Sequence, residues 1–197
     1  MNLILATRNN GKVEELRALL KGLSVELTSL ADHPDLPKTV EDGDTFLANA
    51  RKKAHEVAKA TGQWALADDS GLAVEALDGA PGVISARYAG KDGDHAANNS
   101  KLLEAMKDVP AGKRQAAFVC CMVLASPDGK EWHVEDRCEG EIVFELTGTG
   151  GFGYDPLFYV EQFGKTMAEL EMDQKNSISH RGKALRQMKD VLLEILG

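Results

Sequence analysis

The stretch Gln115–Ala125, QAAFVCCMVLA, decides the class of fold. It is a long β-type run of apolar residues, and Ser126–Lys130, SPDGK, follows it as a hairpin turn signal. Glu131–Cys138 then returns as a second strand, and Glu141–Leu146 is predicted as a third. We therefore expect an antiparallel meander in the second half of the chain.

The first half of the chain has a different pattern, in which short apolar runs alternate with helical periodicity. We expect strands over Leu3–Thr7, Ser24–Leu30 and Trp64–Ala67, and helices over Val13–Leu20, Thr45–Thr61, Ala96–Asp108 and Gly182–Leu196. An alternating half joined to a meander predicts an α/β architecture with a mixed sheet. Residues 1–197 are expected to form a single domain with two lobes and a cleft between them.

The composition excludes several classes of protein. The 197 residues are 43% apolar and 27% charged, which is ordinary for a globular chain. A net charge of −8 argues against a nucleic-acid partner, because phosphate neutralisation needs a basic face, and 6% aromatic residues are few for base stacking. The apolar runs are too short for a membrane span, and no signal peptide is expected. Cys120, Cys121 and Cys138 have no metal-ligand spacing and are odd in number, which fits a reducing cytosol.

The segment Thr7–Lys12, TRNNGK, lies where a strand ends and a helix begins. Backbone N–H groups at the N-terminus of a helix make an anion site. Lys12 opposes the helix dipole in the first turn, and a bound phosphate would explain it. The alternative is a capped helix start with an exposed lysine. A Walker A loop is excluded, because Val13 follows the lysine.

Adjacent carboxylates, Asp68 and Asp69, are expected at the end of a strand, followed by Ser70. Such a pair is unfavourable unless it is solvated or binds a cation, and Mg²⁺ takes one or two carboxylates plus substrate phosphates. Glu41, in an acidic loop, could supply another ligand. Lys53, in the helix after that loop, borders an apolar face from which it could reach a phosphate. The alternatives are an exposed turn with an Asp cap and a snorkelling surface lysine.

The glycine-rich stretch Gly148–Gly153, GTGGFG, matches GxGxxG, but the dinucleotide interpretation is rejected. That fingerprint must open a helix, whereas Tyr154-Asp155-Pro156 follows here. Free N–H groups beside Phe152 and Tyr154 suit a planar base, and the alternative is a flexible surface loop.

The stretch Ser179-His180-Arg181 precedes the last helix, and Lys175 lies just before it. Ser179 is a plausible N-cap. His180 and Arg181 then place positive charge at the positive end of the helix dipole, which is unfavourable without an acceptor. The alternative is a basic surface turn.

Together these motifs closely resemble the inosine triphosphate pyrophosphatase family, the non-canonical purine (XTP/dITP) pyrophosphatases. The resemblance runs along nearly the whole chain, and six motifs in order make it highly specific. The motifs are Thr7-x-Asn9-x-Gly11-Lys12, Glu41-x-Gly43-x-Thr45-Phe46-x-x-Asn49-Ala50-x-x-Lys53-Ala54, Ala67-Asp68-Asp69-Ser70-Gly71-Leu72, Ala80-Pro81-Gly82-x-x-Ser85-Ala86-Arg87-Tyr88, Gly150-Gly151-Phe152-Gly153-Tyr154-Asp155-Pro156 and Ser179-His180-Arg181. One departure is Arg8, at a position where glycine is frequent in the family.

The resemblance implies an elongated mixed sheet flanked by helices, two lobes with a central substrate cleft, and a homodimer. It implies a cytoplasmic enzyme that uses Mg²⁺ to hydrolyse ITP, dITP and XTP to the monophosphate and pyrophosphate, and so clears deaminated purines. By resemblance, Asp69 is the catalytic carboxylate, as metal ligand or base, and Glu41 is a metal ligand, with Asp68 a further candidate. The substrate-binding residues are then Thr7, Arg8, Asn9, Asn10, Gly11, Lys12, Lys53, Ser70, Phe152, Gly153, Tyr154, Asp155, Lys175, His180 and Arg181.

Two other classes of function are open. One is a nucleotide-binding regulator without turnover. Asp68, Asp69 and Glu41 argue against this class, because extra carboxylates do not help a protein to bind an anion. The other is a different phosphohydrolase, such as a phosphomonoesterase, which would release phosphate first.

Overall fold

The predicted hairpin is present in the computed structural model, which describes the backbone of residues 1–197 and every side chain except that of Leu19. Strands β4 (Gln115–Ala125) and β5 (Glu131–Ile142) flank the turn. Ser126 closes the turn, because its N–H donates to the carbonyl of Lys130. Gly129 takes the left-handed φ of 88° that such a turn needs.

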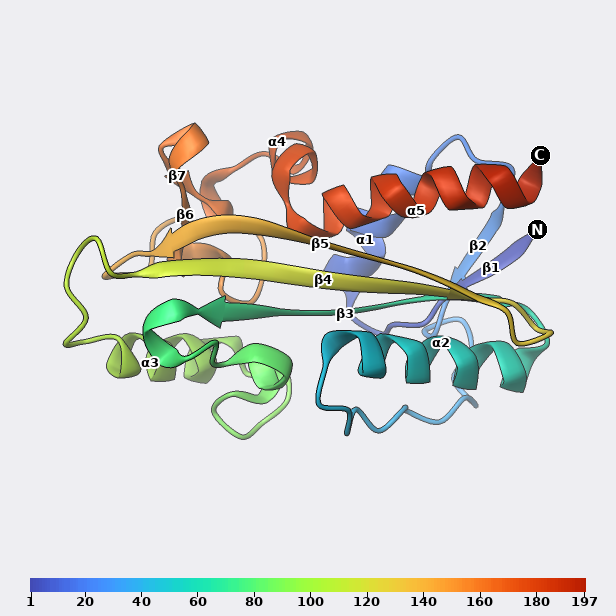
Figure 1. Ribbon diagram of the computed structural model, residues 1–197, viewed down its shortest axis with the longest axis horizontal. Coiled ribbons are helices and arrows are strands. Elements are labelled where there is room, and N and C mark those ends of the chain that lie inside the picture. Colours follow the sequence, from blue (N-terminus) through green and yellow to red (C-terminus); the bar gives the residue numbers. More distant parts are fainter. The chain divides into compact units, whose positions relative to one another are not determined.

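One mixed sheet, in the order β2-β1-β3-β4-β5-β6-β7, organises the described backbone (Figure 1). β1 pairs in parallel with β2 and with β3, whereas β6 pairs antiparallel with β5 and with β7. The other strands are β1 (Asn2–Leu5), β2 (Glu26–Ser29), β3 (Trp64–Val74), β6 (Phe158–Val160) and β7 (Lys165–Thr166). The predicted α/β class with a mixed sheet is confirmed.

Several ends of the α-helices carry capping residues of favourable type. Asn9 and Thr45 accept backbone hydrogen bonds at the starts of α1 and α2, and Gly62 ends α2 with a φ of 66°. The helices are α1 (Asn10–Leu20), α2 (Phe46–Thr61), α3 (His95–Ala105), α4 (Met172–Ile178) and α5 (His180–Leu196), with short 3₁₀ helices at Glu75–Leu77, Gly82–Arg87, Asp155–Leu157, Glu161–Phe163 and Met167–Glu169. None of these described helices is long and apolar enough to cross a bilayer.

Several predicted boundaries are wrong, because α3 ends at Ala105, before the predicted Asp108, and α5 begins at His180, before the predicted Gly182. Two further errors concern strands. Asp68 and Asp69 do not end a strand, because β3 continues through them to Val74. Glu141–Leu146 is not a separate strand, because β5 runs on to Ile142. In β5 the apparent turn residue Gly140 lies within the strand, where a Cβ would collide with the backbone and ring of neighbouring β6.

The chain divides into two compact units. Unit 1 comprises Met1–Asp69, Cys120–Asp136 and Arg181–Gly197, and unit 2 comprises Ser70–Val119 and Arg137–His180. In unit 1, alternate residues of β1 face opposite cores: Leu3 and Leu5 pack with α1 and α5, and Ile4 packs with α2 (Figure 1). Unit 2 has its own core, which includes Leu72, Met106, Phe118 and Phe158. The single domain with two lobes and a central cleft stays a prediction.

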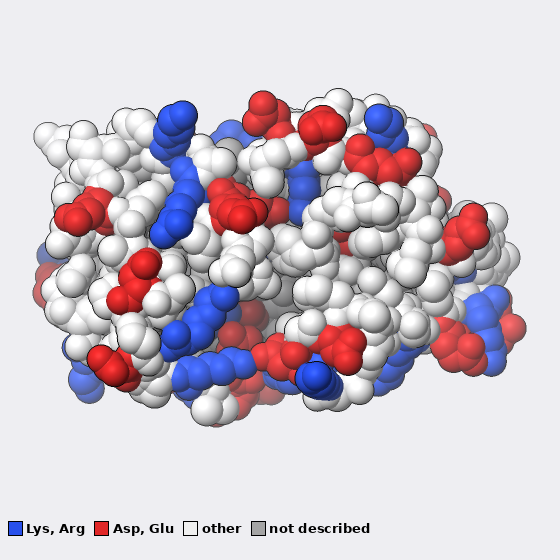
Figure 2. Space-filling view, turned by 180° about the vertical axis from the view of Figure 1, so that it is seen from behind, with Lys and Arg blue, Asp and Glu red and all other residues white. Residues whose placement is uncertain are grey.

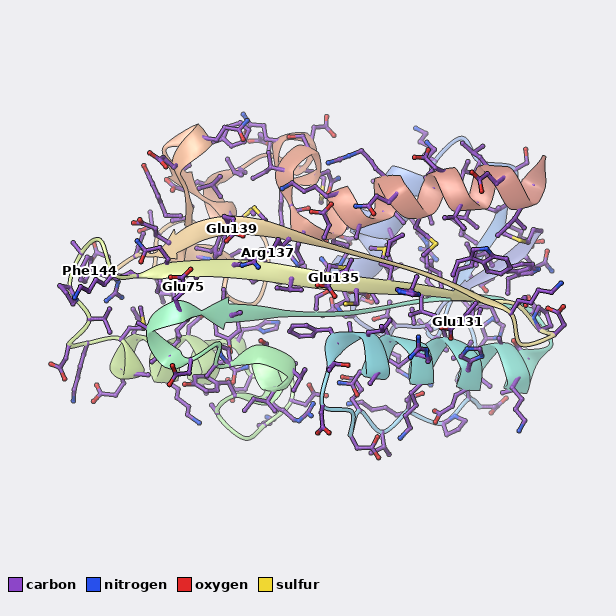
Figure 3. All side chains as sticks on the ribbon, viewed as in Figure 1. Glu75, Glu131, Glu135, Arg137, Glu139 and Phe144 are labelled. Atoms are coloured by element: carbon purple, nitrogen blue, oxygen red, sulfur yellow. The ribbon has the colours of Figure 1, made fainter. Side chains whose placement is uncertain are left out.

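Charged residues of both signs are scattered over one face of the molecule. Figure 2 shows lysine and arginine scattered among acidic side chains over the described part of that face. Along β5, Glu131, Glu135, Arg137 and Glu139 form a charged row (Figure 3). β6 pairs with β5 only at Glu141 and Ile142, so the row lies on a stretch without β6 beside it. Charges on such a strand disfavour pairing with other chains.

Candidate active site

The predicted site residues are divided between the two units, and the residues of each unit are described by themselves. Unit 1 holds Thr7–Lys12, Glu41, Lys53, Asp68, Asp69 and Arg181, and unit 2 holds Ser70, Phe152–Asp155, Lys175 and His180.

Asp69 is the centre of the unit 1 cluster, and α2 supplies its partners. Lys53 Nζ lies 3.1 Å from Asp69 Oδ1, and Asn49 Nδ2 donates to Asp69 Oδ2 at 3.2 Å. Asn49 and Lys53 are four residues apart, so they share a helix face. The ammonium of Lys53 also lies 3.1 Å from Glu41 Oε1. Two carboxylates from distant parts of the sequence therefore meet at one cationic position.

The loop that carries Glu41 is held by Gly43. Its N–H donates to Asn49 Oδ1 at 2.8 Å. A Cβ on Gly43 would lie 2.8 Å from that same oxygen and 2.9 Å from Ala48 Cβ, so only glycine fits. Asn49 thus binds both Asp69 and the loop, a role that sequence reasoning did not assign to it.

Burial tunes the ionisation of this cluster. Asp69 is 6% exposed, and burial, with Glu41 nearby, raises its pKa although Lys53 and Lys12 oppose the shift. Burial alone would lower the pKa of Lys53, but Asp69, Glu41 and Asp68 together raise it. Lys53 therefore stays charged, while Asp69 becomes a better proton acceptor than an ordinary aspartate.

Asp68 faces the opposite side of β3, as alternation along a strand predicts. Lys12 Nζ lies 2.8 Å from Asp68 Oδ2, and Arg181 Nε donates to the same oxygen at 3.2 Å. Arg181 also pairs with Glu15, a buried carboxylate of α1. Burial would raise the pKa of Asp68, but Lys12, Arg181 and Lys53 hold it well below the usual range. Asp68 thus stabilises two cations and stays ionised.

Lys12 lies at the positive end of the helix dipole, and its ion pair with Asp68 offsets this unfavourable position. The rest of the segment forms the capped start of a helix, which was the alternative interpretation. Asn9 Oδ1 accepts from the Lys12 N–H at 3.1 Å, and Asn9 N–H donates to Thr7 Oγ1 at 3.2 Å. The guanidinium of Arg8 donates to the carbonyls of Leu30 and Leu36. Asn10 and Gly11 form the first turn of α1.

Replacing Arg181 should destabilise the fold strongly. Arg181→Met leaves Asp68 and Glu15 buried with one cation fewer, and breaking such pairs typically costs about 3–5 kcal/mol. Arg186 lies exposed on the same helix, so Arg186→Met should change the free energy of unfolding by less than about 0.5 kcal/mol. Urea titration of both variants measures this difference. Equal stability of the two would show that the Arg181 pairs contribute nothing net.

The glycine loop of unit 2 is closed by Asp155. Asp155 Oδ2 accepts from the Phe152 N–H at 2.8 Å and lies 2.7 Å from Lys175 Nζ. Gly151 has a φ of 70°, and a Cβ there would collide with the Asp155 carboxylate. A short 3₁₀ helix and β6 follow, and no α-helix opens here, so rejecting the dinucleotide fingerprint is confirmed.

Aromatic rings surround this loop. Lys175 Nζ lies 4.8 Å from the centroid of the Phe152 ring, and Phe152 faces His95 at 6.4 Å. The hydroxyl of buried Tyr154 donates to the Ser85 carbonyl at 2.8 Å. His180 stacks on Phe118 with centroids 4.9 Å apart. Lys175 belongs to α4, which sequence reasoning did not predict, and Ser70 follows Asp69 in β3.

Sequence reasoning also missed Glu15, Ser85 and Asn99 as parts of these clusters. The spacing of Glu15 from Lys12, three residues along a helix, was a usable signal. Ser85 was quoted only within a motif, and nothing local marks Asn99.

The donor set of unit 1 fits a hard cation. Among the described residues, no three His, Cys, Asp or Glu side chains are arranged to hold a metal ion by themselves. Glu41 and Asp69 nevertheless converge on one ammonium, at 3.1 Å each. One or two carboxylates completed by substrate phosphates and water are what Mg²⁺ typically binds.

Comparisons with known proteins show the family to which the chain belongs. Residues 3–191 match the Ham1 family, and the chain belongs to that family. A protein of Desulforamulus reducens named dITP/XTP pyrophosphatase is 53% identical over 192 residues, covering 98% of this chain and 96% of its own length. A dITP/XTP pyrophosphatase of Geobacter sulfurreducens is 54% identical over 190 residues, covering 96% of each chain.

Solved structures show the same fold. A HAM1 protein from Coxiella burnetii superposes with a TM-score of 0.89 at 42% identity, covering 98% of this chain and 99% of its own. A nucleoside-triphosphatase, dITP/XTP pyrophosphatase, from Mycobacterium abscessus gives a TM-score of 0.77 at 46% identity, covering 95% and 97%. The family resemblance expected from the motifs is confirmed.

Proposed function

We propose that the protein hydrolyses non-canonical purine nucleoside triphosphates, ITP, dITP and XTP, to the nucleoside monophosphate and pyrophosphate. The observation that carries this proposal is the buried cluster in which Glu41 and Asp69 share Lys53. Relatives also support the proposal. Proteins that are about half identical to this chain over nearly its whole length are named dITP/XTP pyrophosphatases.

In this proposal Asp69 activates the attacking water. Its carboxylate accepts the proton of a water molecule as the water oxygen bonds to the α-phosphorus. The bond from that phosphorus to the pyrophosphate oxygen breaks, and pyrophosphate leaves. The raised pKa of Asp69 favours this proton transfer. Glu41 and Asp69 would hold Mg²⁺. Asp68 is a weaker candidate, because its carboxylate already pairs with Lys12 and Arg181. The ion supplies charge stabilisation for the phosphates when it is bound.

The remaining residues bind the substrate. The triphosphate is bound by Thr7–Gly11 at the N-terminus of α1, together with Lys12 and Lys53. The chain has a net charge of −8, so positive groups near the phosphates must neutralise their charge. By the family resemblance, the residues that contact the base and sugar are Ser70, Phe152–Asp155, Lys175, His180 and Arg181. Positioning and charge neutralisation supply most of the catalysis in phosphoryl transfer.

The first test is the identity of the product. ITP, dITP, XTP, GTP and ATP are each incubated with the protein, with and without Mg²⁺, and phosphate and pyrophosphate are quantified separately. We expect pyrophosphate and monophosphate in equal amounts from ITP, and only with Mg²⁺. Phosphate as the first product would indicate a phosphomonoesterase, and binding without turnover would indicate a regulator.

We further propose that the enzyme is a homodimer and acts in the cytoplasm, where the nucleotide pool lies. Both rest on the family resemblance. Light scattering coupled to size exclusion measures the first directly, and a mass of 21.3 kDa would contradict it.

A further inference from the structure

Four consecutive residues of the glycine loop are each held by a buried group of unit 2. The Phe152 N–H donates to Asp155, the Gly153 carbonyl accepts from Asn99 Nδ2 at 3.0 Å, and the Tyr154 hydroxyl donates to Ser85. The Asp155 carboxylate binds Lys175. Of these anchors, only Asn99 binds the loop backbone from another element.

Helix α3 presents two side chains to this loop. His95 and Asn99 are four residues apart and so share one face of the helix. The ring of His95 lies against Phe152, and the amide of Asn99 binds the next residue, Gly153. The loop therefore rests on one face of α3 at the point where it carries its aromatic side chain.

The amide of Asn99 is only half satisfied. Asn99 is 6% exposed, and for its Oδ1 the described residues supply no hydrogen-bond partner. An unpartnered buried acceptor is unfavourable for the fold, so stability alone does not explain an asparagine here. Its neighbour Asn98 uses both ends, donating to the Ala86 carbonyl and accepting from the Ala89 N–H. Asn98 is thus a complete structural clamp, and Asn99 is not.

The bond from Asn99 orients a peptide plane. The Gly153 carbonyl and the Tyr154 N–H belong to one planar trans peptide and point in opposite directions. Gly153 has a φ of 63°, a conformation in which glycine is easily rotated. By fixing the carbonyl, Asn99 aims the Tyr154 N–H away from α3, and the described backbone includes no acceptor for this N–H.

We propose that Asn99 is a positioning residue for base selection: it holds the Gly153–Tyr154 peptide so that the Tyr154 N–H is presented as a donor to the C6 oxygen of a 6-oxopurine. The proposal rests on the proposed function. Adenine carries an NH₂ donor at C6, so a fixed N–H favours hypoxanthine and xanthine over adenine. Without Asn99, the peptide can rotate and present its carbonyl oxygen, which accepts a hydrogen bond from the C6 amino group of adenine.

The test compares Asn99→Leu with the matched variant Asn98→Leu. Asn99→Leu keeps the branching of the side chain, with a larger volume, and removes the donor. We expect the ratio of kcat/KM for ITP to that for ATP to fall about tenfold, because one oriented hydrogen bond is lost, with little change in Tm. Asn98→Leu breaks two satisfied bonds, so its Tm should fall while the ratio stays within about twofold. Asn99→Asp, which keeps the shape but replaces the donor by an acceptor, should also lower the ratio.

A second measurement does not depend on turnover. Hydrogen exchange of the peptide covering residues 150–156 should be faster in Asn99→Leu than in the wild type, and unchanged in Asn98→Leu. An unchanged purine ratio, unchanged loop exchange, or an equal fall of the ratio in both variants would overturn the proposal. Absence of ITP turnover in the wild type would instead contradict the proposed function, and the exchange experiment would still decide the role of Asn99 in the loop.

Discussion

Asp69→Asn is expected to lower kcat by about 10²-fold or more while the protein stays folded. The substitution is nearly isosteric, but it removes the carboxylate that accepts the proton and holds the cation. Asn49 and Lys53 still surround the position, so binding of the triphosphate should change much less than kcat. Steady-state kinetics with ITP at saturating Mg²⁺ measure the effect.

Two controls accompany this variant. Asp42→Asn removes an exposed carboxylate of the neighbouring loop that binds only Lys52, and it should leave kcat within about twofold. Because the folded protein raises the pKa of Asp69, its charged form disfavours the fold at neutral pH, so Asp69→Asn should be at least as stable as the wild type. More than half of the wild-type kcat in Asp69→Asn would show that Asp69 is not catalytic.

The raised pKa also places the acid limb of the pH–rate profile. Asp69 must be ionised to accept a proton, so kcat falls as the pH falls through its pKa in the complex. In the metal-free protein this pKa lies above the ordinary aspartate value, because the carboxylate is buried.

ITP and XTP are expected to be hydrolysed far better than ATP. Hypoxanthine and xanthine present an acceptor oxygen at C6, whereas adenine presents a donor. The donors of unit 2 beside the loop are Lys175, which Asp155 holds, and the N–H groups of the loop. Against adenine each buried donor left unpaired costs about 1–3 kcal/mol, so two mismatches amount to roughly 30-fold to 10⁴-fold in kcat/KM.

Kinetics with ITP, XTP, GTP and ATP under one Mg²⁺ concentration measure this selectivity. GTP is informative, because guanine shares the C6 oxygen and this argument does not exclude it. Rejection of GTP would require a separate effect of the 2-amino group. Comparable kcat/KM values for ATP and ITP would show that the donors of the loop do not recognise the base.

The fold was predictable where apolar patterning is strong. The strand Gln115–Ala125, the turn at Ser126 and the helix predicted over Thr45–Thr61 are all present, because each has a local physical signature. The errors fall where tertiary contacts override local signals. Asp68-Asp69-Ser70-Gly71 looks like a turn, yet it stays in β3 because Lys12 and Lys53 neutralise the two carboxylates from opposite sides. Gly140 looks like a turn residue and is instead required by the close approach of β6.

The site was predictable as a set of motifs and not as a set of contacts. The residues Asp69, Lys53 and Glu41 were identified together, and the structure brings them together. The pairing of Arg181 with Glu15 and Asp68 joins positions more than a hundred residues apart, which one sequence cannot show. Asn99 acts through a single bond to a distant carbonyl, so no pattern of residue types marks it.

The most direct test of the central claim, attack of water on the α-phosphorus, is hydrolysis of ITP in ¹⁸O-labelled water followed by ³¹P NMR of the products. The account predicts pyrophosphate and inosine monophosphate in equal amounts, with the label entirely on the phosphate of the monophosphate. Label in the pyrophosphate, or inorganic phosphate as the first product, would contradict it.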